Sequence, residues 1–204
     1  MIEDVPSPIE LRQMPDAIAW EASALAKRPC RPQFFAAFSA AVLALPKPQA
    51  RILELGSGPG FLAERLLQDH PAISYVALDF SPAMHHLATK RLSPFAERVT
   101  FVERSFREQG WASGLGQFDC IVTNQAVHEL RHKRHALALH QAVRQALRPG
   151  GTYLVCDHFC GLGGQSNDQL YMSVQEQRVC LEQAGFARVE ALLETGGLVL
   201  HAAA

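Results

Sequence analysis

The sequence is poor in charge and has no apolar run long enough to cross a membrane. Charged residues make up 19% of its 204 residues and hydrophobic residues 48%, with a formal net charge of −1. This composition argues against disorder and gives no overall attraction to nucleic acid or to an anionic membrane. The longest apolar stretch, residues 34–45, is interrupted by Ser39 and stopped by Pro46. It is therefore too short for a transmembrane helix.

Cysteine is also scarce, and its spacing is uninformative for metal or disulfide frameworks. The five cysteines, at positions 30, 120, 156, 160 and 180, form no CxxC pair. The first residues are acidic and include Pro6, whereas a secretory signal needs a basic start and an apolar run. We therefore expect reduced thiols in a cytoplasmic protein.

What the sequence does have is an alternation of apolar strands with helices. Residues 51–55, 73–78, 99–102, 118–123 and 152–156 have the pattern of strands, and residues 61–68, 82–92, 132–147 and 172–184 that of helices. This alternation predicts an α/β fold, with a mainly parallel, doubly wound sheet and helices on both faces. Two last strands, 187–193 and 198–201, are separated by Gly196-Gly197, which is too short for a crossover, so the final strand should be antiparallel.

Residues 1–48 precede this pattern and are predicted to form an extension. An irregular arm is followed by two helices, at 16–27 and 33–45, separated by prolines. We interpret the extension as a lid over a pocket or as a dimer contact, with helices that simply cover the sheet as the alternative, and residues 49–204 as the main domain.

The strongest local signal is the run of three glycines, Gly56, Gly58 and Gly60, between a strand and a helix. Glycines in such a turn let the backbone approach a ligand closely. The spacing differs from the GxGxxG dinucleotide fingerprint, because Phe61 stands where that fingerprint has its last glycine. Glu54 precedes the loop, and a carboxylate there suits a cationic ligand better than a pyrophosphate.

A second acid, Asp79, ends the next strand 19 residues after Gly60. A carboxylate at this place can accept hydrogen bonds from ribose hydroxyls, and Phe80 beside it can lie against a planar base. The alternative for Asp79 is a helix N-terminal acid next to Ser81-Pro82, but the glycine loop upstream favours the ribose role.

Five segments in order resemble the class I S-adenosylmethionine (SAM)-dependent methyltransferases, a Rossmann-like family. They are ILELGSGPG at 52–60, LDFSPAM at 78–84, VTFVERSF at 99–106, FDCIVTNQAVHEL at 118–130 and LRPGGTYLVCDH at 147–158. The resemblance implies seven strands, with the last inserted between the fifth and sixth. It also implies SAM as cofactor, S-adenosylhomocysteine (SAH) as product and methyl transfer as the reaction.

The resemblance also implies a set of cofactor-binding residues. Glu54 would help to fix the loop and the methionine amino group of SAM, and the glycine loop would pass under the ligand. Asp79 would bind the ribose, and the backbone of the segment after the fourth strand would face the methionine part. The family often has Gly-Asp where this chain has Arg104-Ser105, so contact between Ser105 or Phe106 and adenine is a weaker expectation. The full set is Glu54, Gly56, Ser57, Gly58, Gly60, Asp79, Phe80, Ser105, Phe106, Asn124 and Gln125.

Catalytic candidates lie after the fourth and fifth strands, where ligands bind in this fold. His128, Asp157 and His158 are there, and a histidine can accept a proton near neutral pH. The alternatives are a packing or capping role for His128 and a metal cluster that includes Cys160. Because the spacing of a metal motif is missing, we expect no metal.

The expected acceptor is a small molecule. Trp20, Phe34, Phe35 and Phe38 would give the helical extension an apolar inner surface. The basic run 131–135 could touch RNA or an acidic substrate, but a solvated helix start is favoured and nucleic acid is not expected. The alternatives kept open are methylation of RNA or protein and a non-catalytic SAM-binding protein; a dehydrogenase is disfavoured. We expect a monomer or a homodimer.

Overall fold

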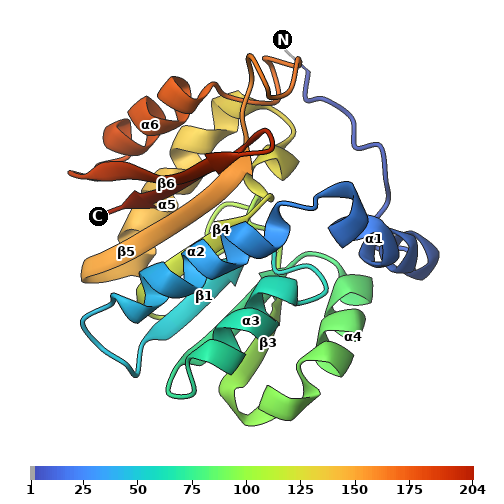
Figure 1. Cartoon of the computed structure of the whole chain (residues 1–204), viewed down its shortest axis with the longest axis vertical. Coiled ribbons are helices and arrows are strands. Elements are labelled where there is room, and N and C mark those ends of the chain that lie inside the picture. Colours follow the sequence, from blue (N-terminus) through green and yellow to red (C-terminus); the bar gives the residue numbers. More distant parts are fainter. Residues whose placement is uncertain (1–2) are drawn as a thin grey trace.

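A computed structural model describes residues 3–204, and its centre is a seven-stranded sheet (Figure 1). The strand order is β3-β2-β1-β4-β5-β7-β6, and β7 runs antiparallel to both β5 and β6. This confirms the predicted α/β class and the inserted antiparallel last strand. The strands are β1 Arg51–Leu55, β2 Ser74–Asp79, β3 Val99–Glu103, β4 Phe118–Asn124, β5 Leu147–His158, β6 Val189–Thr195 and β7 Leu198–Ala203.

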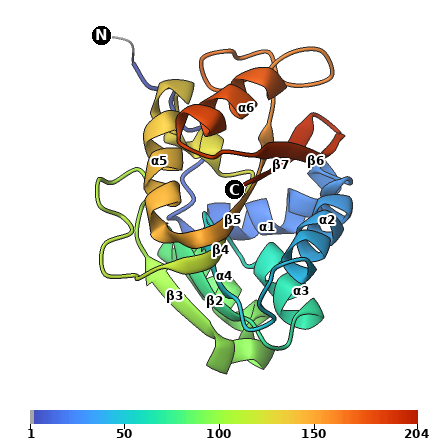
Figure 2. The same cartoon turned by 90° about the vertical axis from the view of Figure 1, so that its left-hand side faces the viewer.

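Helices cover both faces of this sheet, as Figure 2 shows. Helices α5 (Ala136–Ala146) and α6 (Val174–Gln183) pack on one face, and α2 (Arg31–Leu43), α3 (Phe61–Asp69) and α4 (Pro82–Arg91) pack on the other. Alternate strand residues belong to different cores, because successive side chains of a strand point to opposite faces. The two apolar layers hold the strand ends in fixed positions, which a ligand site at those ends requires.

The N-terminal part lies across the carboxyl ends of the strands. Helix α1 (Met14–Lys27) packs against α4, and Ala17, Met84 and Leu87 form a small separate core. Phe34 and Phe38 were expected on the inner surface of a lid. They are fully buried against the sheet, because α2 lies along its face, which is the alternative that the sequence left open for this helix. The division of the chain at residue 48 stays a prediction.

Two element boundaries differ from the sequence prediction by four residues or more, and the others by one or two at most. The fifth strand begins at Leu147, not Thr152: Leu147 pairs with Phe118, the segment that includes Pro149 then bulges, and pairing resumes between Thr152 and Cys120. A proline is tolerated in a strand at such an irregularity. The preceding helix starts at residue 136, not 132, because residues 127–130 and 133–135 form short 3₁₀ turns.

Local capping explains where two helices start. Ser81 accepts a hydrogen bond from the Met84 N–H at 3.0 Å, with Pro82 at the first helical position, as predicted. Ser173 and Glu176 form a reciprocal capping box at α6. Within residues 3–204, none of the helices is long and apolar enough to cross a membrane.

Candidate functional site

A cavity of about 680 Å³ opens at the carboxyl ends of β1, β2 and β4. Its floor includes Glu54, Asp79 and Asn124, each at or near the end of one of these strands. The N-terminal segment and the α1–α2 joint form other walls. Open α/β sheets bind ligands at this edge, where the strand order reverses between β1 and β4. All of the predicted cofactor residues except Gly60 line this cavity, as do His128 and His158. Gly60 packs against Leu92 and Ala88, and Asp157 lies behind His128.

The glycine loop has the backbone conformation that requires glycine. Gly56 and Gly58 have φ angles of +68° and +53°, which L-residues adopt only at a cost. A Cβ on Gly56 would also lie 2.5 Å from the Cβ of Ala126, whereas one on Gly58 would meet no atom within 4 Å. Gly56 is therefore fixed by packing, while Gly58 borders open space in the cavity.

Asp79 holds this loop in place. One carboxylate oxygen accepts the Gly58 N–H at 2.8 Å, and the other accepts the Ser81 N–H at 2.9 Å. Burial raises the pKa of Asp79 to about 6, although both N–H groups act to lower it. Asp79 also lines the cavity. It therefore supports the loop, a role the sequence did not predict, and keeps unused lone pairs for a ligand.

Glu54 is buried and shares a hydrogen bond with Tyr75, whose hydroxyl donates to it at 2.9 Å. Burial raises the pKa of Glu54 to about 8 against the opposing effect of the tyrosine, and the charge of Asp79 raises it further. The carboxyl is thus poised to ionise when a positive group enters the cavity. Tyr75 was not identified from the sequence, because its pairing with Glu54 requires the β1–β2 register.

Several buried polar atoms around the cavity have no hydrogen-bond partner among residues 3–204. They include Ser57 Oγ, Asn124 Oδ1 and Gln125 Nε2, all on residues that line it. Gln125 adopts a φ of +57°, unusual for a non-glycine residue, and its N–H donates to the Cys156 carbonyl at 2.7 Å. A buried unpaired polar group is costly, so these atoms are suited to hydrogen bonds with a ligand.

The other end of the cavity is built around Phe80. The Arg12 guanidinium lies over its ring, 5.2 Å from the centroid, an N-terminal contact that sequence reasoning missed. Ser105 and Phe106 line the same end. Arg104 points away and donates to the carbonyls of Trp111 and Ser113. Because Arg104-Ser105 stands where the family often has Gly-Asp, this end of the cavity offers the aromatic rings of Phe80 and Phe106 and the Ser105 hydroxyl in place of a carboxylate.

The catalytic candidates form one cluster. His128 Nδ1 lies 2.7 Å from Asp157 Oδ1, the His128 N–H donates to the other oxygen at 2.8 Å, and Nε2 lies 3.4 Å from Glu129. Burial lowers the pKa of His128, but the charge and hydrogen bond of Asp157, together with Glu129, raise it to about 10. His128 is therefore a cation at neutral pH, held between two carboxylates.

His158 has the opposite character. Its ring lies 5.4 Å from that of His128 and 5.7 Å from that of Tyr171, and its Nδ1 has no partner. Burial lowers the pKa of His158 to about 4, and the His128 charge adds to this effect while Asp157 opposes it. His158 is thus neutral at pH 7. Tyr171, which also lines the cavity, comes from the segment after β5 and carries no sequence motif.

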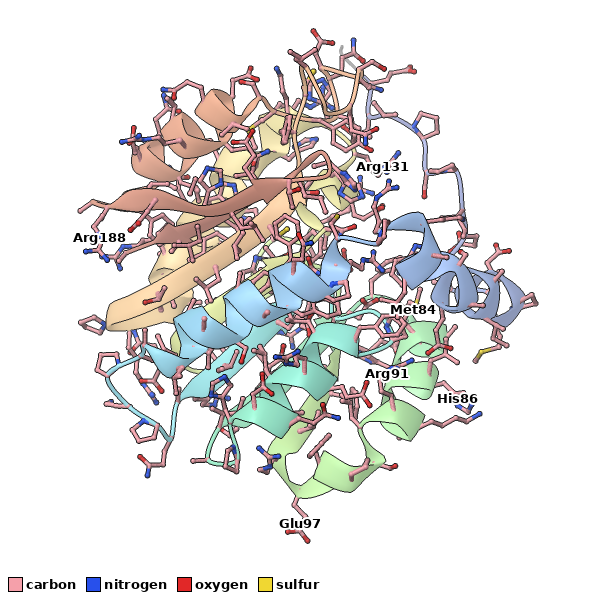
Figure 3. The ribbon with its side chains drawn as sticks, in the orientation of Figure 1. Met84, His86, Arg91, Glu97, Arg131 and Arg188 are labelled. Carbon is pink, nitrogen blue, oxygen red and sulfur yellow. The ribbon has the colours of Figure 1, made fainter. Side chains whose placement is uncertain are left out.

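The basic run 131–135 does not form the solvated helix start that we expected. Arg131 is buried, with a φ of +65°, and donates to the carbonyls of Val5 and Pro6 at 2.9 and 2.7 Å; Figure 3 shows it beside the N-terminal segment. Arg134 and His135 both contact Asp4. The run therefore fastens residues 4–6 over the cavity, a long-range contact that local charge patterning cannot show.

The cysteines and acids supply no further chemistry at the site. Within the described part of the chain, no group of three or more His, Cys, Asp or Glu side chains is placed to hold a metal. The cysteines are free thiols, and burial raises the pKa of Cys156 well above its usual value.

Comparisons with known proteins agree with this architecture. A family model described as a methyltransferase domain matches residues 52–151. The chain is similar to malonyl-[acyl-carrier protein] O-methyltransferase of Paenibacillus sp. (strain JDR-2), with 26% identity over 159 residues that cover 69% of this chain and 56% of the relative. It is also 30% identical over 113 residues to the reducing polyketide synthase Preu2 of Preussia isomera, covering 53% of this chain and 5% of the synthase. The chain thus spans about half of the first relative and a small part of the second.

Solved structures share the fold. An O-methyltransferase family protein from Burkholderia thailandensis aligns with a TM-score of 0.73 and 19% identity, over 92% of this chain and 59% of that one. The structure of DhpI with SAH aligns with a TM-score of 0.69 and 19% identity, over 98% of both chains. The matched domain includes the glycine loop and Asp79, and the sheet order is that implied by the ordered motifs. The family model, the methyltransferase relative and these structures together support a class I SAM-dependent methyltransferase family for this chain.

Proposed function

We propose that this chain transfers a methyl group from SAM to a small-molecule acceptor. One observation carries the proposal: a single cavity brings together the glycine loop, two buried acids of elevated pKa and unpartnered polar atoms. These groups match the chemistry of SAM, which has an ammonium, a sulfonium and ribose hydroxyls but no phosphate.

The residues that would hold SAM follow from these groups. Glu54 suits the ammonium, because a cation favours its ionised form. Asp79 suits the ribose hydroxyls, since each oxygen already bound to an N–H keeps acceptor capacity. Phe80 and Ser105 suit the adenine. Gly58 leaves the space that a ligand lying on the loop needs.

Bound SAM supplies an activated methyl group for in-line transfer to a nucleophile. The protein's residues align the acceptor, exclude water and accept a proton where the acceptor has one. His158 fits the last role better than His128, because it is neutral and its Nδ1 is free. His128 is held as a cation by Asp157, so these two residues fit positioning and charge balance around His158.

Support for a small acceptor comes from the walls of the cavity. The N-terminal segment and α1 enclose it, and relatives are named for malonyl-[acyl-carrier protein] methylation and polyketide synthesis. An RNA acceptor has less support, because Arg131 and Arg134 are engaged with residues 4–6. A cytoplasmic location and a monomeric or homodimeric state stay predictions from the sequence.

Calorimetric titration with SAM, SAH and NAD tests the cofactor assignment. We expect SAM and SAH to bind and NAD not to bind. Binding of NAD alone would overturn the proposal. A non-catalytic SAM binder would give the same titrations but no transfer of label from methyl-labelled SAM to any compound in an acceptor screen.

A matched pair of variants tests the site. Asp79→Asn should weaken SAH binding by at least tenfold. Asp119→Asn is the control, because Asp119 also binds a backbone N–H, that of Arg51 at 2.9 Å, but lies outside the cavity lining. Equal SAH affinities in the two variants would remove Asp79 from the cofactor site.

The assignment of the base needs a turnover assay with an identified acceptor. We expect His158→Gln to lower kcat by about 10²–10⁴-fold, the usual contribution of a general base. Unchanged kcat across the pH range would show that no proton is accepted by His158.

A further inference from the structure

The three tyrosines of the chain have hydroxyls in three different settings. The hydroxyl of Tyr75 donates to Glu54. That of Tyr153 is buried in the core beneath α5 without a partner. Tyr171 is half-buried and is the one of the three that lines the cavity. Among residues 3–204 its hydroxyl has no hydrogen-bond partner, so it is free to bind a ligand.

Tyr171 has a fixed backbone although it lies in no helix or strand. It belongs to the segment between β5 and α6, drawn in orange in Figure 1. Its N–H donates to the Asn167 carbonyl at 3.0 Å, and the Asn167 side chain accepts the N–H groups of residues 169 and 170 at 3.1 and 3.2 Å. The Met172 carbonyl accepts the Cys160 N–H at 2.9 Å. A side-chain-capped turn on one side and this cross-contact on the other therefore hold Tyr171 in place.

The ring of Tyr171 packs against both histidines of the catalytic cluster. Its centroid lies 5.6 Å from that of His128 and 5.7 Å from that of His158, and the two histidine rings also contact each other at 5.4 Å. The ring meets His158 edge-on, an arrangement that aromatic pairs favour. The hydroxyl is therefore kept in the same part of the cavity as the histidine that we assign as proton acceptor.

The Tyr171 hydroxyl is protonated at neutral pH and so has a proton to donate. Burial raises the pKa of Tyr171, the negative charges of Asp157 and Glu129 add to this effect, and Arg131 and Arg28 oppose it. Glu129, Arg131 and Arg28 all line the cavity. The charges that act on the hydroxyl thus surround the same space as the proposed acceptor site.

We propose that the Tyr171 hydroxyl donates a hydrogen bond to the oxygen that receives the methyl group, so that the enzyme methylates a hydroxyl compound. This inference rests on the proposed methyltransferase function. A hydroxyl satisfies both neighbours, because it donates its proton to neutral His158 and accepts from Tyr171. In the proposed transfer the oxygen gains the methyl group and loses its proton to His158, and SAH keeps the electron pair of the broken S–CH3 bond.

A protonated amine fits this part of the cavity less well. It has no lone pair to accept a proton from Tyr171. The cation of His128 and the guanidinium of Arg28, which both line the cavity, also repel it. The chemistry of the site therefore favours oxygen over an ammonium group as the methyl acceptor.

SAM has oxygens of its own, in the ribose and the carboxylate, and they are the competing source of the same chemistry. The contact of Tyr171 with His158 favours the acceptor, because we assign the ribose to Asp79 at the end of another strand. The two sources differ in which ligand loses affinity when the Tyr171 hydroxyl is removed.

The first arm measures hydroxyl recognition in the SAH-saturated protein. The probes are 4-nitrophenol and 4-nitroaniline, titrated by calorimetry at a pH at which their absorbance shows both to be uncharged. Both can donate to His158, but the aniline nitrogen is a poor acceptor because its lone pair is delocalised into the ring. The wild-type protein should bind the phenol about three- to tenfold more tightly, as one neutral hydrogen bond allows, and Tyr171→Phe should lose this preference. Equal binding of the two probes by the wild-type protein, or no binding of the phenol, would overturn the inference.

The second arm measures SAH affinity. We expect Tyr171→Phe to bind SAH as tightly as the wild-type protein, within about threefold. If the variant loses affinity for SAH and keeps the phenol preference, Tyr171 serves the cofactor and the inference is wrong. Tyr153→Phe is the matched control, because it removes a hydroxyl that also has no partner but does not line the cavity; it should keep both the preference and the SAH affinity.

The ionisation of bound 4-nitrophenol gives a readout that a change in packing alone would not move. A hydrogen bond donated to the oxygen stabilises the phenolate more than the phenol. The pKa of the bound probe, followed by the phenolate absorbance, should therefore be lower in the wild-type protein than in Tyr171→Phe by about 0.5 or more. The same pKa in both proteins would show that Tyr171 does not contact the oxygen.

Folding and the proposed function are checked separately. Thermal melting shows whether Tyr171→Phe folds; if it does not, Tyr171→Leu gives a second variant that should also lose the phenol preference. If the wild-type protein binds no SAH, the proposed function fails, while the comparison of the two probes in the free protein still decides whether Tyr171 recognises a hydroxyl.

Discussion

Replacing Gly58 with alanine separates the conformational role of the loop from its role in ligand binding. Gly58 and Gly110 have φ angles of +53° and +75°, and a Cβ on either would meet no atom within 4 Å. Alanine at either position therefore has the same penalty, about 1–2 kcal/mol for a left-handed backbone, without a clash. For a chain of this size, that penalty lowers the Tm by about 2–8 °C.

Of these two glycines, Gly58 lines the cavity and Gly110 does not, so only Gly58→Ala of this pair should affect the ligand. A Cβ in the space proposed for SAM should weaken SAH binding by at least tenfold, or about 1.4 kcal/mol. Gly110→Ala should bind SAH like the wild-type protein. Scanning calorimetry measures the first effect and titration calorimetry the second. Equal SAH affinities in the two variants would refute the placement of the ligand on the loop.

Three further predictions concern pH. SAH affinity should rise from pH 6 to about 8, because binding the ammonium requires ionised Glu54, whose pKa is about 8 in the free protein. Glu54→Gln should abolish this rise. A rise that persists in the variant would exclude Glu54 as its origin. The pKa of His128 is raised from 6.5 to about 10, so its contribution to the free energy of unfolding is fully present below pH 6.5 and is lost as the pH rises toward 10. The free energies of unfolding of the wild-type protein and His128→Gln, measured with denaturant, should therefore converge at high pH. Burial lowers the pKa of His140 and His201 to about 4, so their contribution is present above pH 6.5 and lost as the pH falls toward 4; His201→Leu should reduce this acid sensitivity, and an unchanged acid slope would argue against it.

The fold was largely predictable because its signals are local. Apolar strands, the Ser81-Pro82 cap and the Gly196-Gly197 turn each depend on residues near one another in the chain, and each is observed. The start of β5 was missed because pairing of Leu147 with Phe118 continues the strand past a bulge. Ladder contacts of this kind are set by a neighbouring strand rather than by propensity.

The residues of the site were predictable only where they belong to a recognisable sequence motif. The glycine loop, Asp79 and the histidines were identified by position, and all line or adjoin the cavity. The difference in charge between His128 and His158 was not predictable, because it depends on which ring faces Asp157. The contact of Arg131 with the N-terminal segment was not predictable for a related reason: its partner Val5 lies 126 residues away in the sequence.

The N-terminal segment has a kinetic consequence for the enzyme. Residues 4–12 form one wall of the cavity and are attached near both ends. At one end Arg131 donates to the Val5 and Pro6 carbonyls and Asp4 pairs with Arg134. At the other the Leu11 carbonyl accepts from the Ser81 hydroxyl, and Arg12 lies over Phe80. This wall has no helix or strand of its own, so opening it breaks a few side-chain contacts and leaves the sheet intact. We therefore expect the exchange of SAH for fresh SAM to depend on how often these contacts release, so that a segment outside the sheet limits the residence time of the product.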